Sequence, residues 1–323
     1  MYIHFRYHMV SRLFCFLSLF FTSASFFIAA ERNSSTINKT VFDKEELSEK
    51  DLIYFKTYEG KLQELQKKLF LEKNDEVKLK LNEEFTEILD TVLAAERSFF
   101  YAFDSLKEIT RIYSPDNYFR IINWNIYKKD GTYLYFGFLQ TYDSKKKTYE
   151  YFKLKNHPEL VKSAETFVGS HEKWLGMLYY KIIKNDNFYT LLGWDGNSKI
   201  IQKKYIEVLY FKKNGDPVFG KDVFKFSRKN PRRIVFQYSA EVVMSLKYDE
   251  ARKLIVFDHL APKDSFMEGQ YQYYGPDFSF DAFELHKDKW RYVEDVDIKN
   301  IKTKNDNVKH KENKKEKPIY TPH

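Results

Sequence analysis

From residue 115 onward, short aromatic and β-branched runs follow one another, separated by turn residues. These residue types are enriched in β-strands, so each run predicts a strand. The connectors Lys129–Gly131, Asn185–Asn187, Asn214–Asp216 and Tyr248–Glu250 are all short. A short connector joins antiparallel neighbours, because a parallel pair needs a long crossover. The pattern predicts an antiparallel β meander over 113–298, arranged as a sandwich, a barrel or a propeller-like fold.

The runs place strands at intervals along this part of the chain. The predicted strands are Tyr118–Tyr127, Tyr133–Tyr142, 148–154, 174–183, 187–193, 203–212, 233–239, 241–248, 253–260, 280–286 and 289–296. Helical patterns do not alternate with these strands, and no glycine-rich phosphate loop occurs between them. A parallel dinucleotide-binding fold is therefore excluded.

The preceding section, 41–112, has helical rather than strand spacing. Apolar residues recur every three or four positions among lysines and glutamates, at Leu47, Phe55, Tyr58, Leu62, Leu65 and Leu69, and again at Val77, Leu81, Phe85, Ile88 and Val92. Asn74 and Asp75 offer capping oxygens between the two stripes. We expect two antiparallel helices, with a short third, packed on the sheet because their apolar stripes need a partner. The fold class is α+β, mostly β.

The first 30 residues predict export. Arg6 and Arg12 precede the apolar run Leu13–Ala30, which ends in small residues before Glu31. This is the charged, apolar and small-residue pattern of a secretory signal peptide. An uncleaved anchor is the alternative, because the run approaches the ~20 residues that span a bilayer. We expect cleavage, and hence a protein of the periplasm, the cell surface or the medium; membrane attachment would follow only from an uncleaved signal.

The single cysteine, Cys15, lies inside this signal. After cleavage the chain could form no disulfide, no thiolate metal site and no cysteine nucleophile. A chain of this length can bury a sufficient core without disulfides, which agrees with a bacterial envelope protein.

The net charge of +8 is concentrated at the two ends of the chain. The signal contains two arginines, and residues 299–323 contain eight lysines against three acidic residues, which leaves about +1 for everything between. No basic groove is implied, so nucleic acid is not an expected partner. The 31–40 segment is read as a polar linker, and 299–323 as a disordered basic tail.

Common catalytic and metal-binding patterns do not occur in the sequence. His157, His171, His259 and His286 are widely scattered, and the histidine that a zinc-protease helix needs four residues after His171 is missing. No Gly-x-Ser-x-Gly is present either, so nucleophilic hydrolysis has no motif. We expect no metal and no cofactor.

The segment Trp194–Ser198 has the Asp-x-Asn spacing of a calcium loop, but Ile206 stands where the loop's last glutamate would be. Asp-Gly between two predicted strands favours a hairpin turn instead. Trp194 and Asp195 remain candidate ligand-binding residues.

The chain from 258 to 281 predicts a long loop that follows the apolar strand Leu254–Phe257. Its candidate ligand-binding residues are Asp258, His259, Asp264, Tyr274, Asp277 and Asp281. Carboxylate pairs are what glycosidases use, and aromatic rings could hold a sugar. The structural alternative is that the aspartates bond turn amides and the tyrosines pack the loop down. Asp258 and His259 would point to opposite faces if the strand extended that far.

Several short phrases of the chain resemble a group of uncharacterised exported proteins from Bacteroidetes-type bacteria. The phrases are Ile109–Asp116, Phe119–Trp124, Leu192–Gly196, Val256–Leu260 with Pro262, and Tyr274–Ser279, and the likeness spans about residues 45–298. The resemblance implies an envelope address and no catalytic residue.

Two hypotheses of function follow. The first is an exported, non-enzymatic binding or interaction module, because an export signal is present without a catalytic motif. The alternative is a hydrolase directed at a glycan or another envelope polymer, using carboxylates of the 258–281 loop. Two of these carboxylates converging in one cleft would favour the enzyme.

Overall fold

The computed structural model describes residues 47–225 and 230–297. The expected signal peptide, polar linker and basic tail lie outside these residues. The helices are α3 (Glu49–Leu71) and α4 (Asp75–Leu93), followed by a 3-10 turn at Glu96–Phe100. The strands are β1 (Thr110–Tyr113), β2 (Phe119–Tyr127), β3 (Tyr133–Asp143), β4 (Thr148–Leu154), β5 (Gly169–Ser170), β6 (Leu178–Lys184), β7 (Tyr189–Asp195), β8 (Ile201–Phe211), β9 (Pro217–Phe219), β10 (Phe224–Lys225), β11 (Ile234–Ser239), β12 (Leu246–Asp249), β13 (Leu254–Pro262), β14 (Tyr274–His286) and β15 (Lys289–Val293).

The two helices begin where the sequence supplies side-chain caps. Ser48 forms a capping box with Asp51 at the start of α3. The Asn74 side chain accepts hydrogen bonds from the backbone N–H groups of Glu76 and Val77 at the start of α4. These contacts satisfy donors that the first helical turn leaves unpaired, so the turn between the helices is fixed by its own residues.

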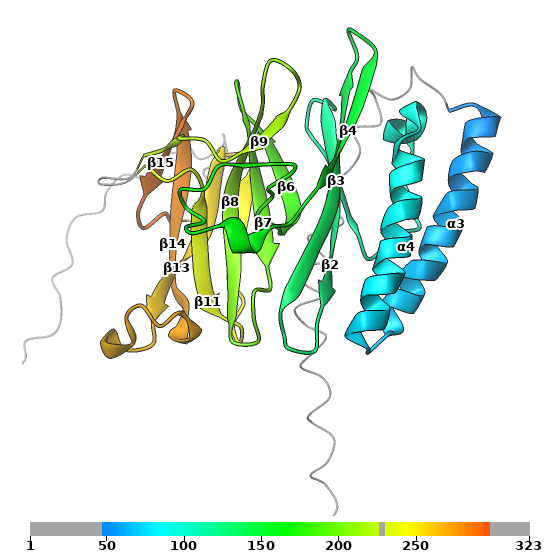
Figure 1. The fold of residues 1–323 in the computed structure, drawn as a ribbon. Helices are drawn as coiled ribbons and strands as arrows, with labels where there is room; N and C mark the ends of the chain where they lie inside the picture. The colour runs from blue at the N-terminus through cyan, green and yellow to red at the C-terminus, as the bar shows by residue number, and fades with distance from the viewer. Residues whose placement is uncertain (1–46, 226–229, 298–323) are drawn as a thin grey trace, which may run out of the picture.

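Three sheets stack side by side, and the helical hairpin covers the outer face of the first (Figure 1). Sheet 1 has the order β1-β2-β3-β4, and sheet 2 has the order β5-β9-β8-β7-β6 with β11 added beside β8. Sheet 3 has the order β10-β15-β14-β13-β12. Successive strands are mostly antiparallel neighbours, and the pairing of β10 with β15 is parallel.

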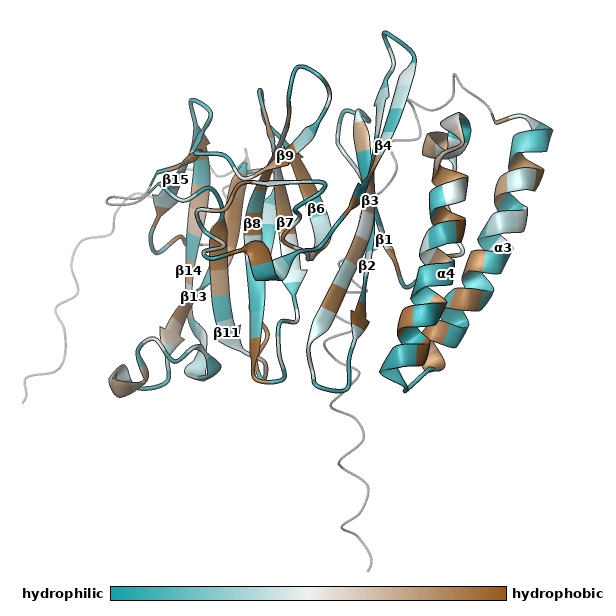
Figure 2. Ribbon diagram, in the orientation of Figure 1, coloured by the Kyte–Doolittle hydropathy of each residue, from teal (hydrophilic) through white to brown (hydrophobic). Residues whose placement is uncertain are grey.

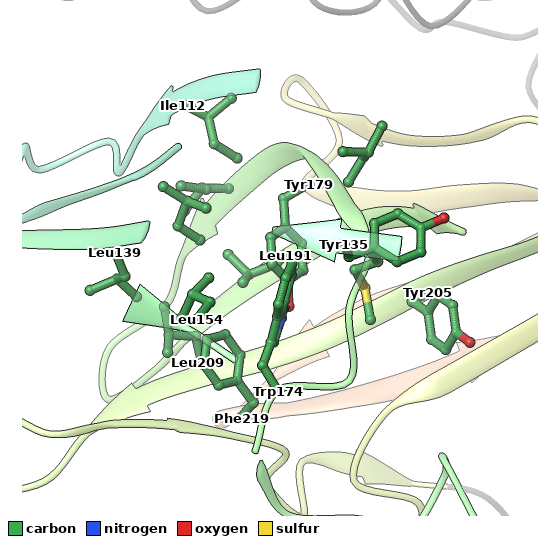
Figure 3. Close-up of a cluster of buried hydrophobic side chains, with 14 of the residues drawn as sticks. Ile112, Tyr135, Leu139, Leu154, Trp174, Tyr179, Leu191, Tyr205, Leu209 and Phe219 are labelled. Atoms are coloured by element: carbon green, nitrogen blue, oxygen red, sulfur yellow. Dashed lines mark hydrogen bonds between the residues drawn. The ribbon is translucent and has the colours of Figure 1, made fainter. Parts of the chain in front are cut away.

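Each gap between layers is filled by one apolar cluster. On β2, Ile122 faces the helices, while its neighbour Ile121 faces sheet 2. On β7, Leu191 faces sheet 1, while Leu192 faces sheet 3. Sheets 1 and 2 are thus apolar on both faces. Figure 2 shows the apolar positions along their strands in brown. Figure 3 shows part of the cluster between them, which includes the fully buried Trp174.

Buried polar side chains also link the layers. The Trp124 indole N–H donates to the Asn82 side chain of α4 at 2.7 Å. The Asn123 amide donates to the Met177 carbonyl between sheets 1 and 2 at 2.5 Å. The Trp290 indole N–H donates to the Thr190 hydroxyl between sheets 3 and 2 at 2.9 Å. A buried polar group costs stability unless it is paired, so these bonds specify how each layer sits on the next.

The expected fold class is confirmed: the protein is mostly-β α+β, with 42% strand against 22% helix and a helical hairpin on antiparallel sheets. The three layered sheets form no closed barrel within 47–225 and 230–297. No helix in those ranges is both long and apolar enough to span a membrane.

The prediction of a long loop over 258–281 was wrong. β13 continues to Pro262 and β14 already begins at Tyr274, so only 263–273 connects them. Proline and glycine are unfavourable inside central strands. Pro262 is tolerated because β12 pairs with β13 only as far as Phe257, and Gly275 and Pro276 are tolerated because β15 pairs with β14 only from Ala282.

A three-residue bulge interrupts β14 opposite His259. Asp258 pairs with Phe280 and Leu260 pairs with Pro276, so Asp277, Phe278 and Ser279 face a single residue of β13. Phe278 has a φ of 72° and is 93% exposed. A bulky side chain rarely adopts this conformation, and bulges often re-aim side chains near binding sites.

Candidate functional site

A cavity of about 510 Å³ lies between β11, at the edge of sheet 2, and the facing surface of sheet 3. We call it the β11 cavity. It is lined by Glu165, Pro231, Arg233, Ile234, Val235, Phe236, Phe257, Asp258, His259, Leu260, Asp281, Phe283 and Tyr292. Its volume lies within the range of roughly 300–1,000 Å³ that is usual for small-molecule sites.

Asp281 is the centre of the polar lining. It is only 4% exposed and accepts three hydrogen bonds. His259 Nδ1 lies 2.7 Å from Oδ2, the Tyr292 hydroxyl donates to the same oxygen at 2.5 Å, and the Asp295 backbone N–H donates to Oδ1 at 3.1 Å. One carboxylate therefore joins β13, β14, β15 and the chain that follows β15.

His259 is the titratable group most exposed to solvent within this cluster, with 44% of its side chain accessible. The hydrogen bond to Asp281 raises the pKa of the imidazole above its ordinary value, against the opposing effect of burial. Charges on Asp281, Asp277 and Glu294 raise the pKa of His259 further. The field at the mouth of the cavity is therefore negative.

Asp258 lines the same cavity as His259, whereas strand alternation alone would place neighbouring side chains on opposite faces. The register between β13 and β14 shifts at this point, between Asp258 and Leu260. The Ser245 backbone N–H donates to Asp258 Oδ2 at 2.7 Å. Burial raises the pKa of Asp258, although the Ser245 bond and the charges of Lys204 and Lys247 oppose the rise.

Three aromatic rings form an arc along the cavity wall. The ring centroid of Phe257 lies 4.7 Å from that of Phe236 and 6.4 Å from that of Tyr292. Phe257 is buried, while Phe236 and Tyr292 are half-buried and therefore accessible from the cavity. Burial, followed by the hydrogen bond to Asp281, raises the pKa of the Tyr292 phenol, so this hydroxyl stays a hydrogen-bond donor at neutral pH.

The structure brings three of the predicted site residues together and separates the other five. Asp258, His259 and Asp281 line the β11 cavity, and the others do not. Asp264 is exposed at the start of a 3-10 turn. Tyr274 accepts a hydrogen bond from the Gly269 backbone N–H at 3.0 Å, and Asp277 accepts from both the backbone and the hydroxyl of Ser279. These contacts stabilise local turns.

Trp194 and Asp195 belong to a different part of the molecule. Asp195 accepts hydrogen bonds from the Tyr135 hydroxyl at 2.8 Å and from the Asn197 backbone N–H at 2.7 Å. Trp194 lies in the cluster between sheets 1 and 2 and donates to Gln202 at 3.2 Å. Asp195 thus closes a hairpin turn against sheet 1, which agrees with the turn interpretation of this segment.

Sequence reasoning missed Phe236, Tyr292, Glu165 and Arg233. Glu165, Arg233 and Phe236 come from segments well before 258–281, whereas Tyr292 lies on the strand that follows, 11 residues after Asp281. No motif connects any of them to that region. Arg233 offered one signal: a charged residue beside the strongly apolar run Ile234–Phe236 had to be paired to be buried. It is fully buried and bonds Glu207 at 2.7 Å.

His259 and Asp281 form the base and orienting carboxylate of a triad, but no serine, threonine or cysteine lines the cavity among the residues that the structure describes. Nor does any group of three or more His, Cys, Asp or Glu side chains in 47–225 or 230–297 have an arrangement that could hold a metal ion.

Comparison with protein-family models, with curated proteins and with solved structures finds no match to this chain. The resemblance to exported Bacteroidetes-type proteins therefore stays a prediction from the sequence.

Proposed function

We propose that this chain is an exported, non-enzymatic binding module that holds a small ligand, or one unit of a larger one, in the β11 cavity. The observation that carries the proposal is the convergence of Asp258, His259 and Asp281 with an aromatic arc in one cavity of about 510 Å³. Ligand sites are concave, mostly apolar and equipped with a few convergent polar groups, and this cavity has those properties.

Binding is favoured over catalysis because the polar groups are already committed to one another. Asp281 accepts three hydrogen bonds, and one ring nitrogen of His259 is held by it. A base needs a nucleophile or a water to activate, and no nucleophilic side chain lines the cavity among the described residues. Such a cluster is instead a rigid hydrogen-bonding surface.

A hydrolase acting on a glycan or envelope polymer is the second candidate, because two carboxylates line the same cavity. Burial raises the pKa of Asp258, as a general acid requires, while Asp281 is the hydrogen-bonded partner. Glycosidases pair carboxyl groups that play these two roles.

Export is supported by the arginine-flanked apolar run at 13–30 and by the lack of cysteine after it. Mass spectrometry of the native product tests this. A mature N-terminus near Glu31 is the expected result, and an intact Met1 in a soluble cytoplasmic fraction would contradict export.

The proposed binding is tested by a screen of the purified protein against glycans, peptidoglycan fragments and small metabolites, run by saturation-transfer NMR. Asp281→Asn should abolish any hit, and Asp264→Asn is the matched control because Asp264 lies outside the cavity. Hits that survive Asp281→Asn would place the site elsewhere. Turnover of a hit that is lost in both Asp258→Asn and Asp281→Asn would favour the hydrolase.

A further inference from the structure

The lining of the β11 cavity carries an excess of negative charge. Glu165, Asp258 and Asp281 are acidic, while His259 and Arg233 are basic. Arg233 is unavailable to a ligand, because its guanidinium bonds Glu207 at 2.7 Å and the Phe167 carbonyl at 2.7 Å, and also donates to the Ala164 carbonyl. The remaining imidazole is paired with Asp281. The charges of Arg233 and of a protonated His259 are therefore each balanced by a carboxylate, which leaves the charges of Asp258 and Glu165 in the lining.

The aromatic rings of the arc can also attract a cation. Phe236, Phe257 and Tyr292 line one cavity with ring centroids 4.7 Å and 6.4 Å apart along the arc. The negative face of an aromatic ring attracts a cation within about 6 Å of its centroid, and more strongly when water is excluded. Rings together with carboxylates are therefore complementary to an ammonium group with attached carbon.

We propose that the β11 cavity binds an organic cation, an amine or quaternary ammonium group held between the Phe236–Phe257–Tyr292 arc and the carboxylates of Asp258 and Asp281. This inference rests on the proposed function, and it names the class of ligand. Glu165, which is exposed, adds negative charge at the rim.

Charge balance favours a cation over a neutral sugar. Asp281 is only 4% exposed and is already paired with His259, so a ligand mainly changes the surroundings of Asp258 and Glu165. Enclosing these two carboxylates with an uncharged ligand removes water from them without supplying a counter-charge, which costs free energy. A cation supplies that charge. The nearby carboxylates raise the pKa of His259, which indicates the same negative potential. Lys204 and Lys247 place positive charge near Asp258, but neither residue belongs to the cavity lining.

The test compares charged probes with uncharged probes of the same shape. Choline is titrated against its carbon isostere dimethylbutanol, and hexamethylenediamine against hexanediol, by NMR on the full-length protein. We expect at least one cation to bind about tenfold or more tightly than its neutral isostere, a ratio that corresponds to ~1.4 kcal/mol.

Variants identify which residues bind the cation and distinguish the contribution of charge to affinity from that of shape. Phe236→Leu keeps apolar volume but removes the ring, and should weaken cation binding several-fold without affecting the isostere. Phe266→Leu is its control, because Phe266 is 74% exposed and lies outside the cavity. Glu165→Gln changes an exposed residue, so it should fold and still weaken cation binding, even if Asp281→Asn does not fold.

Each outcome is decisive. Equal binding of cation and isostere, or cation binding unchanged in Phe236→Leu and Glu165→Gln, overturns the inference. A neutral saccharide that binds in an Asp281-dependent manner, with no cation binding, overturns the inference and leaves the proposed binding function intact. If no ligand of any class binds, both fail.

Discussion

At the scale of single residues, burial rather than distance decides which ion pairs matter. Arg233–Glu207 and Lys155–Glu172 have nearly equal N–O distances of 2.7 Å and 2.6 Å. Both side chains of the first pair are 0% exposed, whereas those of the second are 48% and 51% exposed. A buried charge that loses its partner keeps its desolvation cost, while an exposed one regains water.

We therefore expect Glu207→Gln to lower the free energy of unfolding by about 3–5 kcal/mol. The matched change Glu172→Gln should alter it by less than about 1 kcal/mol. Urea denaturation of the two variants measures both values. If both variants lost less than about 1 kcal/mol in the free energy of unfolding, the charge of the buried pair would contribute little to stability beyond the packing of its side chains.

His259 predicts a pH dependence of stability. Its folded pKa is raised above the ordinary 6.5 by Asp281, so the folded state holds the imidazole proton more tightly than the unfolded state does. The stabilisation is complete below the unfolded pKa and is lost as pH rises through the raised folded pKa. Melting temperatures of wild type and His259→Gln should thus differ most just below pH ~6.5 and converge as the pH rises through the raised folded pKa. A constant or growing difference over this range would contradict the assigned pairing.

At the residue level, the sequence could group residues that lie near one another in the chain, but not those that only contacts between distant strands bring to the cavity. Asp258, His259 and Asp281 were identified because a histidine and carboxylates cluster in sequence. Asp277 and Asp195 carry the same chemistry, but their oxygens accept hydrogen bonds from residues of their own turns. In the sequence, Phe236 and Tyr292 cannot be distinguished from other aromatic residues of strands. Only the fold places β11 and β15 so that both residues line one cavity with residues of β13.

At the scale of elements, periodicity identified the helices and most of the strands, and the Asn74 cap was predicted from its residue type. The error at 258–281 arose because Pro, Gly and Asp usually mark loops. At an edge they are compatible with a strand, and which residues lie at an edge depends on how far β12 extends along β13 and β15 along β14. No local pattern contains that information.

The bulge in β14 predicts a stabilising substitution. Phe278 has a φ of 72° and a fully solvated side chain, so glycine should relieve strain without losing packing. We expect Phe278→Gly to raise the free energy of unfolding by about 0.5–1 kcal/mol. Thermal and urea denaturation measure the change. Destabilisation would mean that the Phe278 ring makes contacts that hold the bulge in place.

At the scale of the whole molecule, the stack of three sheets could not be foreseen. Sheets 1 and 2 are apolar on both faces. A strand with two buried faces lacks the alternation of apolar and polar residues that marks a sandwich strand, so its sequence does not show that its sheet lies between two other layers. The number of layers depends on which faces meet, and buried contacts such as Trp290–Thr190, which joins residues 100 positions apart, decide that.

The layered fold explains why the site lies where it does. β11 shares one edge of β8 with β9, and that position sets it against the face of sheet 3. Apolar packing between the sheets fills the rest of the gap, and the cavity lies beside the point where the register between β13 and β14 shifts. Rigid strands on both sides favour a preformed site.

The central claim, that the β11 cavity is a binding site, is tested most directly by filling it. Leu260→Trp places a larger apolar side chain at a half-buried position of the lining, and Leu160→Trp makes the same change at a residue outside the cavity that is 50% exposed. The measurement is the dissociation constant of the best ligand from the NMR screen, for wild type and both variants. We expect both variants to fold, Leu260→Trp to lose ligand binding, and Leu160→Trp to bind with the wild-type dissociation constant. Wild-type affinity in a folded Leu260→Trp protein would contradict the claim that the β11 cavity is the binding site.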